Sequence, residues 1–294
     1  MVAITIGFIV VASVGYLYLG SRQSFRNTDN MSRMQENARY ALDNMARDIR
    51  MAGSFGCTSL VEGAPTIVAP APAVTNANAI VGGDAGVDPP GVPAGARVAG
   101  DAVSVWGSQG SSVLLSSLTA GANPYALKEN DILAVVTCRP PADVAPTASL
   151  RSAPADLTTL AGAPGDEVME FDRLAYYIAD NPAGVRALYR NSVNDGSAEL
   201  VEGVEDMQIM YGVDTNADRA ADVYQTAAAV ANWEQVVSAR ISLLMASPDD
   251  NITAAAQTYR IDTDDDGTPD DVAAADRRIY QTFSTTVGIR NRLQ

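Results

Sequence analysis

The chain opens with the apolar run MVAITIGFIVVASVGYLYL, residues 1–19, and continues through Gly20 into SRQSFRNTDNMSRMQENARYALDNMARDIRMA, residues 21–52. The first run contains no charged residue and no proline, and a helix of about 20 such residues is long enough to cross a bilayer. Nothing basic precedes it, which argues against a secretory signal peptide. A plain single-pass membrane anchor stays open as an alternative at this point.

The second run has the periodicity of an amphipathic helix. Its apolar residues recur mostly at steps of three and four, as expected for one face of a helix. These residues are Phe25, Met31, Met34, Ala38, Leu42, Met45, Ile49 and Ala52. Opposite charges four residues apart should stabilise the polar face, in the pairs Asp29 with Arg33, Arg39 with Asp43, and Asp43 with Arg47. We therefore expect one continuous helix of roughly 75 to 80 Å, ending at Gly53.

The composition excludes several functional classes. The chain has 294 residues, a net charge of -15 and no histidine. Residues 20–52 hold six arginines and four acidic residues, so the remainder has fourteen basic and thirty-one acidic residues. Such an acidic head repels the phosphates of nucleic acid, and direct nucleic-acid binding is not expected. Without histidine, the chain has neither a Ser-His-Asp nor a Cys-His arrangement, and we expect a structural protein rather than an enzyme.

Residues 54–294 are expected to form a β-rich globular head. Alternating or continuous apolar runs predict seven strands, at 101–106, 132–137, 168–178, 185–190, 204–211, 236–246 and 279–287. The strands at 168–178 and 185–190 should form a hairpin through residues 180–184. An alanine-rich segment, 223–232, predicts a short helix. The strands should form an antiparallel sheet with one face under the long helix.

Two stretches of the head lack periodic order. Residues 61–100 and 139–165 are rich in alanine, proline and glycine, which predicts long irregular loops. The domain organisation expected from sequence is thus a helix over 1–53 and a head over 54–294 that contains these two loops.

Several segments together resemble the PilW family of type IV minor pilins. They are SRQSFR and MSRMQENARYALDNMARDIRMAGSFGC near the amino end, and LYR, LVEGVEDMQIMYGVDTNADRAADVY and FSTTVGIRNRL in the second half. The resemblance is densest in residues 1–57 and 188–294. It implies an α+β, pilin-like fold, in which a long helix, half buried in a filament core, is joined to an exposed β-rich head.

The resemblance also implies a function and a site. A minor pilin takes part in the assembly of a type IV pilus, together with other major and minor pilins, by packing its helix into the filament. The expected filament or membrane interface is formed by Ile4, Phe8, Val11, Val14 and Leu17. The subunit would lie in the inner membrane through residues 1–19 before assembly and in the extracellular pilus afterwards. The leader cleavage motif of the family is not found before the apolar run, so we expect the true start to lie upstream of Met1.

Cys57 and Cys138 are the two cysteines of the chain. For a head located beyond the inner membrane, a disulfide is the favoured state of such a pair. Closing a loop of about 80 residues would contribute roughly 4 kcal/mol in the chain-entropy model. A redox-active pair is disfavoured because the CxxC spacing is lacking, and a two-cysteine metal site because other soft ligands are missing.

Two short acidic loops share one spacing. Positions 1, 3, 5 and 9 are Asp214, Asn216, Asp218 and Asp222 in DTNADRAAD, and Asp262, Asp264, Asp266 and Asp270 in DTDDDGTPD. Alternating oxygen ligands are typical of loops that surround a hard cation, and calcium is the candidate. Gly267 stands at the sixth position of the second loop, where EF-hand-type loops turn sharply.

A solvated turn is the alternative explanation, because Asp and Asn also favour turn geometry. The sequence slightly favours calcium at the second loop and the solvated turn at the first. Neither loop has a bidentate Glu at position 12, so any binding should be weak, with dissociation constants of about 10⁻⁴ to 10⁻³ M. Other functions left open are a J-type pseudopilin of type II secretion, the main pilus subunit, and a membrane-anchored, calcium-dependent adhesive module.

Overall fold

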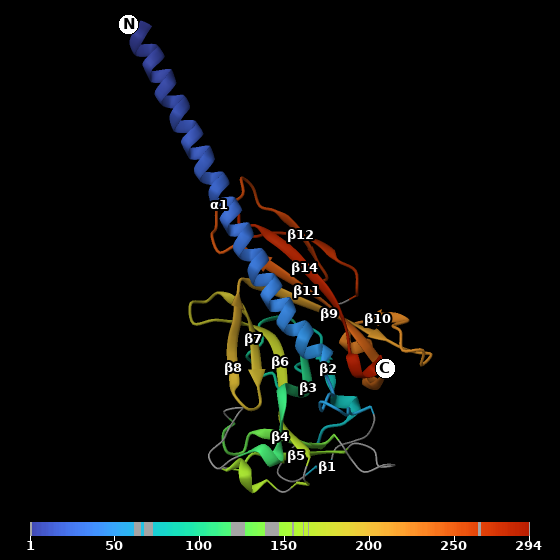
Figure 1. The fold of residues 1–294 in the computed structure, drawn as a ribbon. Helices are drawn as coiled ribbons and strands as arrows, with labels where there is room; N and C mark the ends of the chain where they lie inside the picture. The colour runs from blue at the N-terminus through green and yellow to red at the C-terminus, as the bar shows by residue number, and fades with distance from the viewer. Residues whose placement is uncertain are drawn as a thin grey trace.

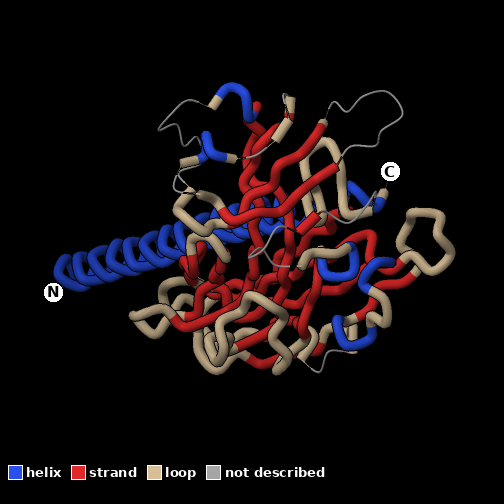
Figure 2. Tube along the Cα trace, turned by 90° about the horizontal axis from the view of Figure 1, so that it is seen from below, coloured by secondary structure: helices blue, strands red, loops and turns tan. Residues whose placement is uncertain are grey.

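The computed structural model of the chain describes residues 2–61, 66–67, 73–118, 127–138, 147–154, 156–160, 162–163, 165–263 and 266–293. Within them, one helix, α1 (Val2–Arg50), is followed by strands and short 3-10 turns. Figure 1 shows α1 extending far beyond the strand-rich head, with the amino terminus at its distant end. Seen from below in Figure 2, the strands gather around one end of the helix. The predicted long helix and the α+β class are confirmed.

The larger sheet contains eight strands in the order β1-β5-β4-β6-β3-β2, with β7 paired to β6 and β8 paired to β7. Its members are β1 (Thr66–Ile67), β2 (Ile80–Gly83), β3 (Ala99–Leu114), β4 (Ile132–Thr137), β5 (Thr147–Ser152), β6 (Asp166–Asp180), β7 (Arg186–Ser192) and β8 (Gly196–Glu202). One edge of β6 is shared, since its first residues pair with β4 and its last residues pair with β7. All of these pairings are antiparallel except that of β1 with β5.

Two smaller sheets complete the described part of the head. A four-stranded sheet has the order β10-β9-β11-β14, and β12 pairs with β13 alone. Their members are β9 (Val204–Val213), β10 (Val223–Gln225), β11 (Val236–Ala246), β12 (Thr258–Ile261), β13 (Asp270–Ala273) and β14 (Tyr280–Gly288). The 3-10 turns are η1 (Asn76–Asn78), η2 (Leu115–Ser117), η3 (Leu157–Thr159), η4 (Ala227–Ala229), η5 (Trp233–Gln235) and η6 (Arg290–Arg292).

All seven strands expected from the sequence are present, and β6 and β7 form the predicted hairpin. The predicted helix over 223–232 is wrong, because this segment contains the short strand β10 and the single turn η4. The two stretches expected to be irregular are partly ordered. Residues 61–100 contain β1 and β2, and residues 139–165 contain β5 and η3. Within these stretches, 62–65, 68–72, 139–146, 155, 161 and 164 lie outside the described residues.

The carboxy-terminal half of α1 packs against strands of both larger sheets, chiefly β14 and β11. Its buried face consists of Met34, Ala38, Ala41, Leu42, Met45 and Ile49, and Met31 packs partly buried beside them. These side chains share one core with residues of β3, β6, β9 and β11. The spacing of the buried residues confirms most of the predicted stripe. Phe25 is the exception, since its side chain is 75% exposed.

Two of the three predicted ion pairs form on the polar face of α1. Asp29 and Arg33 pair at 3.1 Å, and Arg39 and Asp43 at 3.7 Å. Arg47 does not follow the prediction, because its guanidinium lies 3.7 Å from Asp48 and donates to Asn44 at 2.6 Å. The two predicted pairs are exposed, so each stabilises the helix by only a few tenths of a kcal/mol.

One buried polar contact joins α1 to the larger sheet. The hydroxyl of Tyr176, on β6, donates to the carboxylate of Asp48, and both side chains are buried. The guanidinium of Arg190, on β7, lies 3.6 Å from the same carboxylate. Burial, followed by the charge of Asp48, raises the pKa of Tyr176 well above its ordinary value. Ionisation of this tyrosine is therefore coupled to the docking of the helix.

Stability is expected to fall above pH 10. The pKa of Tyr176 is raised in the folded chain, so the unfolded chain loses the tyrosine proton first and unfolding becomes more favourable as the pH rises. Each buried tyrosine of this kind should remove about 1.4 kcal/mol per pH unit from the free energy of unfolding. Urea denaturation between pH 8 and about pH 11 would measure this slope. Tyr176→Phe should make the slope shallower, whereas Phe at the half-exposed Tyr40 should not change it; equal slopes in all three proteins would contradict the coupling.

The predicted disulfide is present between Cys57 and Cys138, whose Cα atoms lie 5.6 Å apart. Cys57 follows the end of α1 and Cys138 follows β4, so the bond joins the helix end to a central strand. A second core lies beside it, in which Phe171 stacks on Phe55 at 4.6 Å and on Trp106 at 5.6 Å.

Candidate assembly interface and acidic loops

The amino-terminal part of α1 projects away from the head. Contacts with the loop before β12 begin with Gln23, whose amide donates to the carbonyl of Ile252 at 2.8 Å, and with Arg26, which lies 3.2 Å from Asp249. Residues 2–22 precede these contacts and make a helix of about 30 Å, close to the thickness of a bilayer's hydrocarbon core. A Cβ atom added at Gly7, Gly15 or Gly20 would have no neighbour within 4 Å.

Large apolar side chains cover this projecting segment, which we call the projecting helix (residues 2–22). Phe8, Val11, Val14 and Leu17, four of the five interface residues expected from the sequence, are between 60% and 76% exposed. Ile4 lies in α1, but its side chain is outside the described residues. Contiguous apolar surface of this kind marks a region that binds another apolar surface. Inside the described residues, no helix is both long and apolar enough to qualify as a membrane span.

Other exposed apolar residues of α1 are not among the five interface residues expected from the sequence. Ile6, Tyr16 and Tyr18 are each more than half exposed on the projecting helix, and Phe25 is exposed just beyond it. Tyr16 and Tyr18 stand where the apolar run gives way to polar residues. Aromatic residues are enriched at such boundaries, and this signal could have identified them.

The first acidic loop, residues 214–222, connects β9 to β10. Asp214 is buried and accepts the amides of Asn216, Ala217 and Arg219 at 2.7 to 3.1 Å. Asp222 accepts the amide and the hydroxyl of Thr215, both at 2.7 Å, and these bonds lower its pKa. Asp214 and Asp222, the first and ninth residues of the loop, therefore close the loop by accepting hydrogen bonds from its own backbone.

The second acidic loop, residues 262–270, connects β12 to β13 and follows the same plan. Asp262 accepts the amides of Asp266 and Gly267, and Asp270 accepts the amide and hydroxyl of Thr263. Gly267 has φ +85°, and Arg219, at the sixth position of the first loop, has φ +69°. Both loops thus turn at the same position in the left-handed conformation, although Arg219 adopts it at a cost. Asp264 lies outside the described residues.

Across the described residues, no group of three or more acidic, histidine or cysteine side chains is arranged to hold a metal ion. Asp214, Asp222, Asp262 and Asp270 satisfy backbone amides instead, which is how Asp stabilises tight turns. Calcium binding at these loops stays a prediction. The amide hydrogen bonds do not use every acceptor position of these carboxylates, since each ionised Asp has about four.

Isothermal titration of the full chain in non-ionic detergent would measure calcium affinity. We expect a dissociation constant of about 10⁻⁴ to 10⁻³ M. Asp262→Asn should weaken binding more than Asp214→Asn, because the second loop contains more carboxylates, while Glu36→Gln on the exposed face of α1 should have no effect. A titration that gives the same heat with calcium as with buffer alone would remove calcium from both loops.

A comparison with protein families gives a match within the second half of the chain. Residues 175–291 match the model of the PilW family, described as type IV pilus-assembly protein W. This part of the chain is similar to the PilW family, and we call residues 175–291 the PilW domain. The match confirms the family resemblance drawn from the sequence, and it relates the chain to type IV pilus assembly and to the cell envelope or surface. A search of curated proteins and a search of solved structures gave no significant match.

The PilW domain covers a defined part of the fold. It begins within β6 and ends in η6, so it includes both acidic loops and the whole four-stranded sheet on which α1 packs. The projecting helix lies outside the matched residues. Its relation to the PilW family therefore rests on the amino-terminal segments quoted above.

Proposed function

We propose that this chain is a minor subunit of a type IV pilus, which enters the filament by packing the projecting helix among the helices of neighbouring pilins. The observation that carries the proposal is the contrast within α1. One half buries its apolar face in the head, whereas the other half presents large apolar side chains that, among the described residues, are more than half exposed. The PilW domain supports pilus assembly as the setting in which this surface is covered.

The proposed mechanism is the transfer of the projecting helix from the inner membrane into the filament core. In lipid, helices associate through close packing rather than through the hydrophobic effect. Leaving the bilayer is then offset by packing against other subunits, and the head stays outside as part of the extracellular pilus. The role is structural, with no catalytic step assigned to any residue.

Quantitative mass spectrometry of filaments sheared from the cell surface tests this function. A small, reproducible ratio of this chain to the principal pilin is expected for a minor subunit. A dominant ratio would make it the main subunit instead. Absence from filaments, with the protein retained in the inner membrane, would favour a type II secretion pseudopilin. Loss of adhesion on chelation of calcium, with normal pili, would favour an anchored adhesive module.

A further inference from the structure

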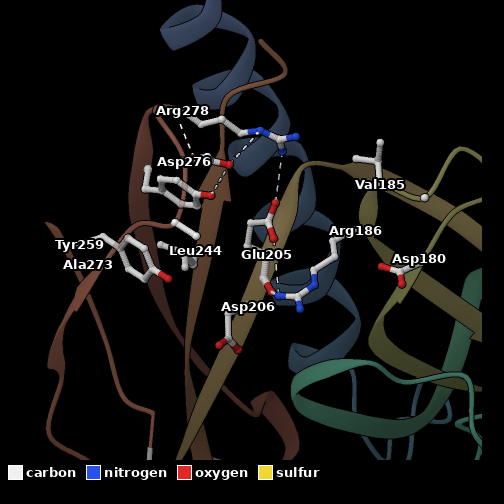
Figure 3. A pocket seen from close by; sticks show the side chains of 13 residues that line it. Asp180, Val185, Arg186, Glu205, Asp206, Leu244, Tyr259, Ala273, Asp276 and Arg278 are labelled. Carbon is white, nitrogen blue, oxygen red and sulfur yellow. Dashed lines mark hydrogen bonds and ion pairs between the residues drawn. The ribbon is translucent and has the colours of Figure 1, made fainter. Parts of the chain in front are cut away.

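A cleft with a volume of about 460 Å³ lies on the head, on the face of the four-stranded sheet opposite to α1. Its floor is formed by Asp206 on β9, Leu244 on β11 and Tyr280 on β14. Leu244 pairs with Asp206 on one side and with Thr282, two residues after Tyr280, on the other. The side chains of Asp206, Leu244 and Tyr280 therefore lie on the same face of the sheet. Their chain neighbours Met207 and Leu243 point the other way, into the core that α1 covers. Figure 3 shows this cleft from close by.

Two turns form the walls of the cleft. One is the turn between β6 and β7, which brings Asp180 and Arg186, and the other is the β12–β13 hairpin with the connection that follows it, which brings Tyr259, Asp276 and Arg278. The volume lies within the range of about 300 to 1,000 Å³ that is usual for ligand clefts. It is far larger than a single metal ion requires.

The charges of the lining are unbalanced in favour of carboxylates. Glu205 lies 3.5 Å from Arg186 and 3.6 Å from Arg278, and Arg278 lies 3.4 Å from Asp276. These four residues form a neutral chain of alternating charges, drawn as dashed lines in Figure 3. Asp180 and Asp206, whose carboxylate also accepts the amide of Met207 at 2.7 Å, add two further negative charges, so the lining carries a net charge of -2.

An aromatic surface lies beside these carboxylates. The rings of Tyr259 and Tyr280 stack with centroids 4.9 Å apart and planes 23° from parallel. Burial and then the neighbouring carboxylates raise the pKa of both hydroxyls, through Asp206 and Glu205 at Tyr259 and through Asp276 and Glu205 at Tyr280. The rings therefore stay neutral at physiological pH, in a region of negative potential.

We propose that this cleft binds an arginine side chain presented on an exposed segment of a partner protein. A guanidinium group stacks on aromatic faces and pairs with carboxylates, and this cleft offers both surfaces side by side. A metal ion gains nothing from the tyrosine pair, and an anion is repelled by the net charge. The net charge of -15 on the chain also attracts a basic segment from a distance.

The proposal does not rest on the pilus function, because the cleft lies on the head and involves no residue of the projecting helix. If the chain proves not to enter filaments, the proposal for the cleft still stands. If the cleft does not bind arginine, the proposed role in the pilus still stands. Binding can therefore be measured on the isolated protein, without assembled filaments.

The experiment uses the full chain in non-ionic detergent at near-physiological ionic strength, with fluorescently labelled, end-blocked peptides. A Gly-Arg repeat peptide is compared by fluorescence anisotropy with Gly-Ser and Gly-Glu peptides of equal length. The arginine peptide should bind measurably and the other two should not. Competition by free arginine at equal concentration, as effective as competition by the unlabelled peptide, would overturn the assignment of a polypeptide ligand.

Matched variants separate the cleft from the general acidity of the chain. The double variant Asp180→Asn with Asp206→Asn should weaken binding of the arginine peptide by about tenfold, a change readily measured. Removing two exposed carboxylates elsewhere, with Glu36→Gln and Glu129→Gln, should change it by less than about twofold, the scale of screened surface charges. Tyr259→Leu, which leaves the charge unchanged, should weaken it severalfold. Equal losses in the two double variants would overturn the proposal, and thermal unfolding would confirm that each variant is folded.

Discussion

Replacing Val11 by aspartate should lower the amount of this chain in sheared filaments about a hundredfold. Val11 lies in the middle of the projecting helix, and its side chain is 71% exposed, so the change should not disturb the head. In lipid, local thinning of the bilayer and water defects relieve an ionised side chain. A core of packed apolar helices gives it neither water nor a partner, so burial there should cost about 3 kcal/mol more than in the bilayer. A difference of this size corresponds to roughly two powers of ten in the equilibrium between assembled and unassembled subunits.

Ser21→Asp is the matched control, because it adds the same charge to the same helix at an exposed polar position near Arg22. It should enter filaments as the unchanged chain does, and Val11→Leu should do the same. The measurement is the ratio of each variant to the principal pilin in sheared material, divided by its amount in whole cells, which corrects for degradation. A Val11→Asp variant present at the normal corrected ratio would show that this surface is not buried in the filament.

Helical periodicity predicts α1 because apolar residues recur every three or four positions over many turns, and these residues form its buried face. The same rule explains the failure at Phe25. The step from Phe25 to Met31 is six residues, and at about 100° per residue Phe25 points roughly opposite to Met34. The head contacts this part of the helix through Gln23, Arg26 and Asn30 instead. An apolar residue that is out of phase with the buried stripe is expected to lie on the exposed face of the helix.

The strands of the head could be predicted where their residues are apolar or alternate between apolar and polar. Segments whose secondary structure depends on tertiary contacts could not be predicted. The segment 223–232 is rich in alanine, yet a helix this short is marginal on its own. Val223 pairs with β9, and the amides of Ala227 and Ala228 are held by the carboxylate of Asp84, from a loop far away in the sequence. No local pattern shows that contact.

The candidate sites divide in a similar way. Phe8, Val11, Val14 and Leu17 could be named from sequence because one linear segment contains them, although Ile6, Tyr16 and Tyr18 on the same segment were not. The cleft could not, because Asp180, Asp206, Tyr259 and Asp276 come from four separate elements and meet only in the folded head. The two acidic loops could be found by spacing. Their shared spacing also describes a turn in which Asp caps its own backbone, so spacing alone does not choose between the turn and the ion.

Removing the disulfide, with Cys57→Ser and Cys138→Ser together, should lower the free energy of unfolding by about 4 to 5 kcal/mol. The bond closes a loop with a sequence separation of 81 residues, and the loss of chain entropy in the unfolded state grows with the logarithm of that length. The loop includes β1 to β4, so its closure restrains a large part of the eight-stranded sheet. Trp106 stacks in the core beside the bond and supplies a fluorescence signal for urea denaturation.

Reduction of the unchanged chain supplies the control for the serine variant. Dithiothreitol should lower its stability to that of the double variant, and the double variant should not respond to the reagent at all. The effect should appear as a lower urea midpoint. The core around Phe55 and Phe171 should unfold first, because the disulfide that joins the end of α1 to β4 lies beside this core. If reduction changes the free energy of unfolding by less than about 1 kcal/mol, the end of α1 must be held by its packing alone, since the entropic contribution of so long a loop would otherwise be measurable.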